Sequence, residues 1–213
     1  MGMQNNSSSA DGCADQAAAK HKQGVSSIAM HDPSEAFAAL ALKPGDCFLD
    51  MGCGAGDYAL RAARIVGTDG LVFALDKWSE VVSGVDEKIK RHALANVRVM
   101  TADITGILPV SDSSVDVCWL CMVLHVPEVR RNAINLAREA RRVLKKSGRL
   151  AVLEIKKEPM PFGPPQNMRL APEETAALVK PYGFARCGFR ELGCSYLIQF
   201  KLDERRNPAL TAG

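Results

Sequence analysis

Short apolar runs alternate with amphipathic stretches along the chain from Ile28 onward. The apolar runs show no internal polar alternation, which is typical of strands in a parallel sheet that helices cover on both faces. Between them, apolar residues recur every four positions, as at Val81, Val85 and Ile89, the spacing of a helix that packs along one face. The pattern predicts an open α/β sheet with right-handed crossovers. The expected parallel strands are 47–51, 71–75, 97–101, 115–121 and 149–155.

Capping residues predict where the first helix begins. Asp32 and Pro33 suit the N-cap and the first helical position. The helix that they open carries Phe37, Leu40 and Leu42 on its apolar side, and a Pro-Gly turn ends it.

The second half of the chain predicts two more helices and a hairpin. An apolar stripe from 129 to 144 predicts a helix with Gly148 in the C-cap position. After a Pro/Gly loop, a further helix is expected over 172–182. Segments 185–192 and 195–202 flank a Gly-Cys pair, the pattern of a β-hairpin. With this antiparallel hairpin the fold becomes a Rossmann-like open sheet of seven strands, mostly parallel, with helices on both faces.

The composition fits one globular domain preceded by a polar tail. The chain has 213 residues, of which 47% are hydrophobic and 24% charged, ordinary values for a chain that forms a core. Residues 1–27 are rich in Ser, Asn, Gln and Ala, so they bury too little apolar surface to offset the entropy of ordering. We expect a flexible tail over 1–27 and one domain over 28–213.

Charge and cysteine content argue against several classes of partner and location. The formal net charge of +3 is too small to indicate nucleic-acid binding, which needs a concentrated basic face. No apolar run reaches the roughly 18 residues of a membrane span, and the N-terminus lacks the features of a secretory signal. An odd number of cysteines, 7, does not fit a secreted disulfide framework. We therefore expect a cytoplasmic protein with no membrane or nucleic-acid partner.

The strongest chemical signal is a glycine-rich turn after the first strand. Asp50 lies near the end of that strand, and the turn that follows contains Gly52, Cys53, Gly54 and Gly56. Glycines let a backbone pass close to a ligand, and ligands of open α/β sheets bind at the carboxyl ends of the strands, where this turn lies. A dinucleotide fingerprint has the different spacing G-x-G-x-x-G. The alternative is a tight strand-to-helix turn that binds nothing.

Acidic residues also end the next two strands. Asp76 lies about 20 positions beyond the turn, where a carboxylate can accept hydrogen bonds from a ribose diol; it could also cap the following helix. Lys77 and Trp78 come next, and the indole of Trp78 could lie against an adenine face. Asp103 and Ile104 follow the third strand, where they could accept from an exocyclic amine and pack on a purine ring.

These features together resemble the class I S-adenosylmethionine-dependent methyltransferases, in particular the small-molecule group that includes ubiquinone- and menaquinone-biosynthesis-like members. The resemblance runs from roughly residue 30 to residue 201. It includes 42–46 before the first strand, 108–116 before the fourth, and 139–150 before the fifth.

This likeness implies that the residues at the strand ends bind different parts of S-adenosylmethionine, the methyl donor. Asp50 and Gly52 would bind the methionine end, and Asp76 would bind the ribose. The backbone near the end of the fourth strand would bind the amino group. Asp103 and Ile104 would bind the adenine. The full set of cofactor-binding residues that the resemblance and the turn imply is Asp50, Gly52, Cys53, Gly54, Gly56, Asp76, Lys77, Trp78, Asp103, Ile104, Leu120 and Cys121.

The chemistry of transfer demands few fixed residues. A sulfonium is already an activated leaving group, so alignment is the main task, and a base is needed only if the acceptor must lose a proton. His125, after the fourth strand, is the candidate base because imidazole titrates near neutrality; a histidine packed in a loop is the alternative. The residues expected near the acceptor are Glu154, Lys156, Lys157, Arg169 and Tyr196, with His31 and Asp32 as candidates for a lid.

The cysteines indicate little chemistry. Cys118 and Cys121 match the C-x-x-C of metal or redox pairs, but residues three apart on a strand point to opposite faces. Cys187 and Cys194 could meet across the hairpin, which would fit a thiol-based methylation of arsenic, a minor alternative. We expect no metal site.

The expected function is transfer of a methyl group from S-adenosylmethionine to a small-molecule acceptor. Enzymes that methylate exocyclic base amines carry an Asn/Asp-Pro-Pro-aromatic motif at the fourth strand, where this chain has Leu-Cys-Met-Val. Two alternatives are a non-catalytic protein that binds the cofactor, as a sensor or a partner subunit, and an NAD-dependent oxidoreductase. The sequence indicates neither the acceptor nor the oligomeric state.

Overall fold

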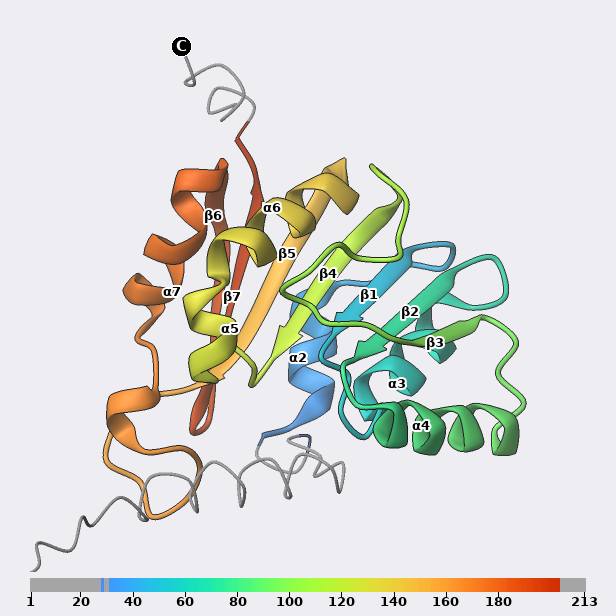
Figure 1. The fold of residues 1–213 in the computed structure, drawn as a ribbon, viewed down its shortest axis with the longest axis horizontal. Helices are drawn as coiled ribbons and strands as arrows, with labels where there is room; N and C mark the ends of the chain where they lie inside the picture. Colours follow the sequence, from blue (N-terminus) through green and yellow to red (C-terminus); the bar gives the residue numbers. More distant parts are fainter. Residues whose placement is uncertain (1–27, 29–30, 204–213) are drawn as a thin grey trace, which may run out of the picture.

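A seven-stranded sheet in the order β3-β2-β1-β4-β5-β7-β6 forms the centre of the molecule (Figure 1). The computed structural model describes Ile28 and residues 31–203, so the expected tail over 1–27 lies outside the described residues. Strands β1 to β5 pair in parallel, and β7 pairs antiparallel with both β5 and β6. The predicted sheet and its terminal hairpin are confirmed. The strands are β1 (Cys47–Met51), β2 (Leu71–Asp76), β3 (Val97–Thr101), β4 (Val115–Cys121), β5 (Leu144–Ile155), β6 (Phe184–Leu192) and β7 (Ser195–Leu202).

Helices cover both faces of the sheet, each over its own apolar cluster. Buried side chains of α2, α3 and α4 pack into one cluster, and those of α6 and α7 pack into the other. Because the parallel strands run the same way, the loops after β1, β2, β3 and β4 meet at one edge. The helices are α2 (Pro33–Leu40), α3 (Asp57–Val66), α4 (Ser79–Arg91), α5 (Pro127–Arg131), α6 (Ala133–Val143) and α7 (Pro172–Val179), with the 3-10 turns η2 (Gln166–Met168) and η3 (Lys180–Tyr182).

The start of α2 follows the prediction and its end does not. Asp32 is the N-cap, its Oδ1 accepts the backbone N–H of Ser34 at 2.7 Å, and Pro33 takes the first helical position. The helix ends at Leu40 because the next residue adopts a left-handed conformation. Leu42 therefore lies beyond the helix, although it still packs against the same cluster.

The predicted helix over 129–144 is instead two helices, interrupted at Asn132. The second, α6, ends at Val143, and β5 begins at Leu144 rather than at 149. Gly148 consequently lies within β5 and is not a C-cap. A Cβ on Gly148 would lie 2.9 Å from the carbonyl oxygen of Val115, so the close approach of β4 and β5 accounts for this glycine. The expected helix over 172–182 also changes type, since α7 is followed by the 3-10 turn η3.

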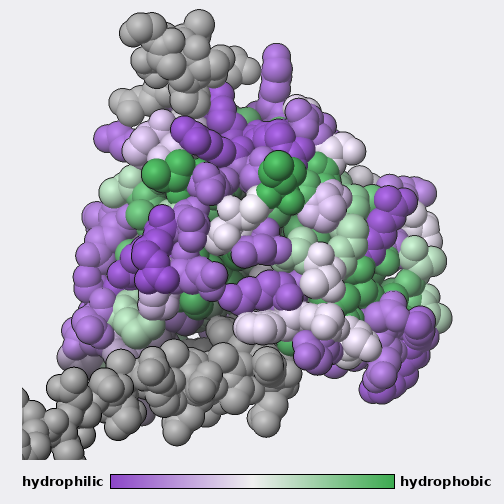
Figure 2. Space-filling view, in the orientation of Figure 1, coloured by the Kyte–Doolittle hydropathy of each residue, from purple (hydrophilic) through white to green (hydrophobic). Residues whose placement is uncertain are grey.

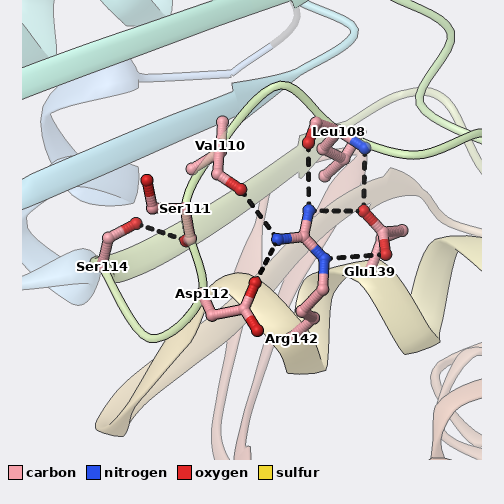
Figure 3. A network of polar contacts seen from close by, with 7 residues as sticks. All are labelled: Leu108, Val110, Ser111, Asp112, Ser114, Glu139 and Arg142. Carbon is pink, nitrogen blue, oxygen red and sulfur yellow. Dashed lines mark hydrogen bonds and ion pairs between the residues drawn. The ribbon is translucent and has the colours of Figure 1, made fainter.

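Arg142 of α6 holds the loop that leads from β3 into β4 (Figure 3). Its guanidinium donates to the carbonyl oxygens of Leu108 at 3.0 Å and Val110 at 2.8 Å, and pairs with Asp112 at 2.6 Å and Glu139 at 2.7 Å. The hydrogen bond from Arg142 keeps the pKa of Glu139 below its usual value. The loop segment 108–112 that resembles the methyltransferases is thus tied to α6 and positions β4.

Figure 2 shows one face of the molecule, on which hydrophilic residues predominate and apolar ones are scattered among them. Among the residues that the structure describes, no helix is both long and apolar enough to cross a membrane.

Candidate functional site

The glycine-rich turn is tied to the end of β2 through its backbone. The N–H groups of Gly52 and Cys53 both donate to the carbonyl oxygen of Leu75 at 2.8 Å. Gly52 has a φ of +85°, and a Cβ there would lie 2.8 Å from Cγ1 of Val123, which follows β4. Only glycine fits this position, because a side chain would meet both an unfavourable backbone conformation and a neighbouring residue.

Asp76 bridges the turn and the start of α4. Its Oδ2 accepts the N–H of Gly54 at 3.1 Å, and its Oδ1 accepts the N–H of Trp78 at 3.1 Å. The N-cap of α4 is Trp78 itself. Asp76 is therefore not the N-cap residue, but it accepts a hydrogen bond from the residue that is. The strand-end carboxylate and the glycine turn that the sequence predicts to act together do lie within hydrogen-bond distance.

Asp50 is a buried carboxyl group at the same edge. Its side chain is 1% exposed, and its Oδ2 has no hydrogen-bond partner. Burial raises its pKa to about 8, the charge of Asp76 adds to the rise, and a backbone hydrogen bond from Ala59 partly offsets it. The negative charge of Asp76 therefore favours the neutral form of Asp50.

The residues after β3 divide between core and solvent. Ile104 is buried, and its Cδ1 lies 3.8 Å from where a Cβ of Gly52 would be. Asp103 is exposed, and its Oδ1 accepts both the N–H of Thr105 at 2.8 Å and its hydroxyl at 2.7 Å. Ile104 therefore joins the glycine turn, whereas Asp103 shapes its own loop.

Lys77 and Trp78 contact each other at the end of β2. The ammonium of Lys77 lies 5.1 Å from the centroid of the indole ring of Trp78, within range of a cation–π contact. It also pairs with Glu128 of α5 at 2.7 Å. Lys77 thereby links β2 to α5.

The cysteines near the site face the core. Cys53 and Cys121 are buried in the cluster beneath α3, while Leu120 and Cys118 are buried in the cluster on the opposite face of the sheet. The expected opposite orientation of Cys118 and Cys121 is confirmed. Burial raises the pKa of the Cys53 thiol, so it stays neutral. The side chains of Cys53, Leu120 and Cys121 therefore belong to the core.

An aromatic group that the sequence reasoning did not single out lies beside Asp50. Tyr58, in the first turn of α3, has its hydroxyl 2.6 Å from Nε2 of His31. Its ring lies 5.1 Å from that of Trp119, the residue that pairs with Asp50 across β1 and β4. The indole N–H of Trp119 is buried without a partner. The sequence offered one indication of Tyr58, which is its position two residues after the last glycine of the turn.

His125 contacts a fully buried carboxylate. Glu154, near the end of β5, is 0% exposed. Its Oε1 accepts the N–H of Leu124 at 2.7 Å, and its Oε2 lies 3.1 Å from Nδ1 of His125. The imidazole keeps 14% of its surface exposed. The structure thus brings together two residues that the sequence places separately on the acceptor side.

The other residues expected near the acceptor have partners elsewhere. Lys156 pairs with Glu191 at 2.8 Å, and Lys157 pairs with Glu174 at 2.6 Å. The buried guanidinium of Arg169 donates to main-chain carbonyl groups of the loop after β5.

Tyr196 is likewise held by the fold. Its hydroxyl contacts Thr175 at 2.7 Å and donates to the carbonyl oxygen of Leu170 at 3.0 Å. Tyr196 therefore supports α7 and the segment before it.

The two hairpin cysteines do not face each other. Cys187 lies in a register shift of β6 beside Gln199 and Phe200, whereas Cys194 lies in the turn that joins β6 and β7. The expectation that they could meet across the hairpin is wrong, because the hairpin pairs residues symmetrically about that turn.

Comparison with known proteins identifies the family. The model of a family described as a methyltransferase domain matches residues 42–190. The chain belongs to the S-adenosylmethionine-dependent methyltransferases. A solved S-adenosylmethionine-dependent methyltransferase from Aquifex aeolicus superposes on this methyltransferase with a TM-score of 0.78 and 27% identity, covering 86% of this chain and 97% of that one. S-adenosylmethionine is the methyl donor of this family.

Curated relatives of this methyltransferase carry different acceptors in their names. An arsenite methyltransferase of Halobacterium salinarum is 35% identical over 146 residues, which are 68% of this chain and 35% of that protein. A 2-phytyl-1,4-naphtoquinone methyltransferase of Synechococcus elongatus is 32% identical over 125 residues, 58% of this chain and 51% of that protein. The methyltransferase thus spans about a third of the first relative's length and about half of the second's.

Proposed function

We propose that this methyltransferase moves the methyl group of S-adenosylmethionine to a small-molecule acceptor at the edge formed by the ends of β1 to β4. The observation that carries the proposal is the hydrogen bond from Gly54 to Asp76 at 3.1 Å. It joins the turn expected to hold the methionine end to the carboxylate expected to hold the ribose. Family membership supplies the donor.

The glycine turn has the features that a close ligand requires. Gly54 has a φ of +50°, and no atom lies within 4 Å of the position that its Cβ would occupy. The buried, unpartnered Oδ2 of Asp50 can accept a hydrogen bond from the donor's ammonium group or from a water bound to it. We infer that Asp50, Gly52 and Gly54 hold the methionine end of the donor.

The nucleoside would lie along the ends of β2 and β3. The Asp76 carboxylate would accept from the ribose hydroxyls, and the buried side chain of Ile104 beside Gly52 would pack on the adenine. Asp103 would accept from the exocyclic amine, and the indole of Trp78 offers a second apolar surface. The backbone of Leu120 and Cys121 would take the amino group of the donor.

The protein's contribution to the reaction is alignment. A base such as His125 takes part only when the acceptor must lose a proton. Holding the acceptor in line with the methyl group can lower the barrier by roughly 7–11 kcal/mol in well-aligned systems.

A small-molecule acceptor is consistent with the net charge of the chain and with the names of its relatives. The net charge of +3 gives no strong attraction for nucleic acid. The proteins named for arsenite and for a naphthoquinone act on small molecules, and we extend that class to this chain.

Turnover is the test. Wild-type protein is incubated with S-adenosylmethionine and an acceptor panel or a cell extract, and S-adenosylhomocysteine is measured by mass spectrometry. The proposal predicts acceptor-dependent formation of S-adenosylhomocysteine. A protein that binds S-adenosylhomocysteine in calorimetry, yet forms none with any acceptor or extract, would be a non-catalytic binder and would overturn the proposal.

A further inference from the structure

A carboxylate buried as deeply as that of Glu154 is costly unless its oxygens are hydrogen-bonded. Both of its oxygens face the segment after β4, one toward the N–H of Leu124 at 2.7 Å and the other toward Nδ1 of His125 at 3.1 Å. Glu154 thus holds the backbone of Leu124 and the imidazole of the next residue, His125. It does so from β5, the neighbouring strand in the sheet.

This contact involves the tautomer of His125, that is, which of its two ring nitrogens carries the proton. A carboxylate only accepts hydrogen bonds, so an ionised Glu154 would require Nδ1 to be the donor. In the neutral imidazole, Nε2 then holds the free lone pair. A buried acid that orients a catalytic histidine in this way is a recurring arrangement in enzymes, where it stabilises the imidazolium formed when the histidine takes a proton.

The segment that carries His125 packs on the donor site. The side chain of Val123 lies against Gly52, within 2.8 Å of where a Cβ would be. The N–H of Met122, which has a φ of +55°, donates to the carbonyl oxygen of Leu153 at 2.8 Å. The loop is therefore held between the glycine turn and β5, with His125 two residues beyond the contact with the turn.

We propose that Glu154 is a positioning residue that holds His125 with the proton on Nδ1, so that Nε2 accepts a proton from the methyl acceptor. The acceptor then belongs to the class that must lose a proton on methylation, a phenol or quinol hydroxyl or a carbon made acidic by one. This inference rests on the proposed function and names the chemistry of its substrate.

The step balances in atoms and charge. The acceptor oxygen or carbon forms a bond to the methyl carbon, and the methyl–sulfur bond breaks with its electron pair going to sulfur. The donor's positive sulfonium becomes the neutral thioether of S-adenosylhomocysteine. The acceptor's proton moves to Nε2 of His125, and the resulting imidazolium keeps its Nδ1–H on the carboxylate of Glu154.

The tautomer of His125 can be measured without knowing the acceptor. Long-range proton–nitrogen NMR spectra of the full chain with S-adenosylhomocysteine distinguish protonated from unprotonated ring nitrogens, and His125→Gln assigns the signals. We expect Nδ1–H in the wild type. In Glu154→Gln the amide oxygen keeps the N–H of Leu124 and the amide NH₂ faces Nδ1, which should move the proton to Nε2. The exposed His92 is the internal control.

Turnover separates positioning from a purely structural role. The panel contains phenols, quinols and carbon acids, with tertiary amines as acceptors that have no proton to lose. We expect methylation of proton-losing acceptors only, and a fall in kcat of about 10²-fold or more in His125→Gln and Glu154→Gln. The dissociation constant of S-adenosylhomocysteine should stay within about 2-fold, because neither change removes a proposed donor contact. Glu191→Gln, a surface carboxylate paired with Lys156, is the matched control.

Each outcome decides one proposal. A wild-type Nε2–H tautomer, a tautomer unchanged in Glu154→Gln, methylation of a tertiary amine, or undiminished kcat in both variants would overturn the positioning role. The absence of any turnover in the wild type would instead overturn the proposed function.

Discussion

Asp50 is a residue whose chemistry depends on its surroundings rather than on its type. Burial raises its pKa to about 8, and the unpartnered oxygen shows that the free protein does not fully satisfy it. In the unfolded chain the same carboxyl titrates near its ordinary value of about 4. Folding therefore takes up a proton between these two pH values.

The sign of the resulting pH dependence follows from that uptake. The stability that the neutral carboxyl contributes is complete near pH 4 and is lost as the pH rises through about 8. Asp50→Asn cannot ionise at this position. Between pH 5 and pH 9 its free energy of unfolding should therefore decrease less than that of the wild type, and the two decreases should differ by at least ~1 kcal/mol. Urea unfolding at both pH values measures this, with the exposed Asp69→Asn as control. Parallel pH profiles for Asp50→Asn and wild type would contradict the assignment.

Asp76 is expected to control affinity for the donor. Asp76→Ala removes the acceptor proposed for the ribose hydroxyls, and hydrogen bonds to charged groups contribute about 1.5–3 kcal/mol. We expect the dissociation constant of S-adenosylhomocysteine to rise about 10- to 100-fold in calorimetry. Asp69→Ala, at the opposite end of β2, should leave it unchanged. An unaltered dissociation constant in a folded Asp76→Ala protein would refute the ribose assignment.

Single residues were predictable where their chemistry is local. The glycines of the turn and Asp76 follow from residue type and spacing, and the structure brings them together. The inward side chain of Cys53, the tilted contact of Tyr58 with Trp119 and the pairing of His125 with Glu154 depend on neighbours far along the chain. A single sequence does not specify such contacts.

At the scale of elements, the turn between β1 and α3 can be probed by adding one methyl group. Gly45 and Gly54 both have positive φ, at +85° and +50°, and neither has an atom within 4 Å of its Cβ position. Alanine at either place should cost about 1 kcal/mol of stability from backbone strain alone. Only Gly54→Ala should also weaken binding of S-adenosylhomocysteine, by about 10-fold or more, because the methyl group would occupy space proposed for the donor. Equal affinities of the two variants in calorimetry would place the donor elsewhere.

Element boundaries were predictable only in part. The Asp-Pro start of α2 carries its own capping chemistry and was correct. The end of α6 was not predicted correctly, because the last helical carbonyl groups accept hydrogen bonds from the loop before β4. The backbone N–H groups of Ser113 and Ser114 donate to the carbonyl oxygens of Arg142 at 2.9 Å and Val143 at 2.8 Å, respectively. Hydrogen bonds from this loop, and not the glycine at 148, therefore mark the end of the helix.

At the scale of the whole molecule, donor binding should stabilise the fold. A ligand at about 100 times its dissociation constant adds about 2.7 kcal/mol to the free energy of unfolding. S-adenosylhomocysteine should raise the Tm in a thermal-shift assay, and NAD at the same concentration should not. A larger shift with NAD would favour the oxidoreductase alternative over the proposed function.

The overall architecture was the most predictable feature. Apolar runs without alternation are typical of strands buried on both faces of a sheet, and the observed seven-stranded sheet, mostly parallel with an antiparallel C-terminal hairpin, agrees with that pattern. The acceptor was not predictable, because methyl transfer requires alignment more than a fixed set of residues.

A crystal structure of the protein with S-adenosylhomocysteine would test the central claim most directly. The account predicts the ribose hydroxyls on the Asp76 carboxylate, the homocysteine along Gly52 and Gly54, and the adenine against Ile104. Density for the ligand away from the ends of β1 and β2, or no bound ligand at saturating concentration, would contradict it.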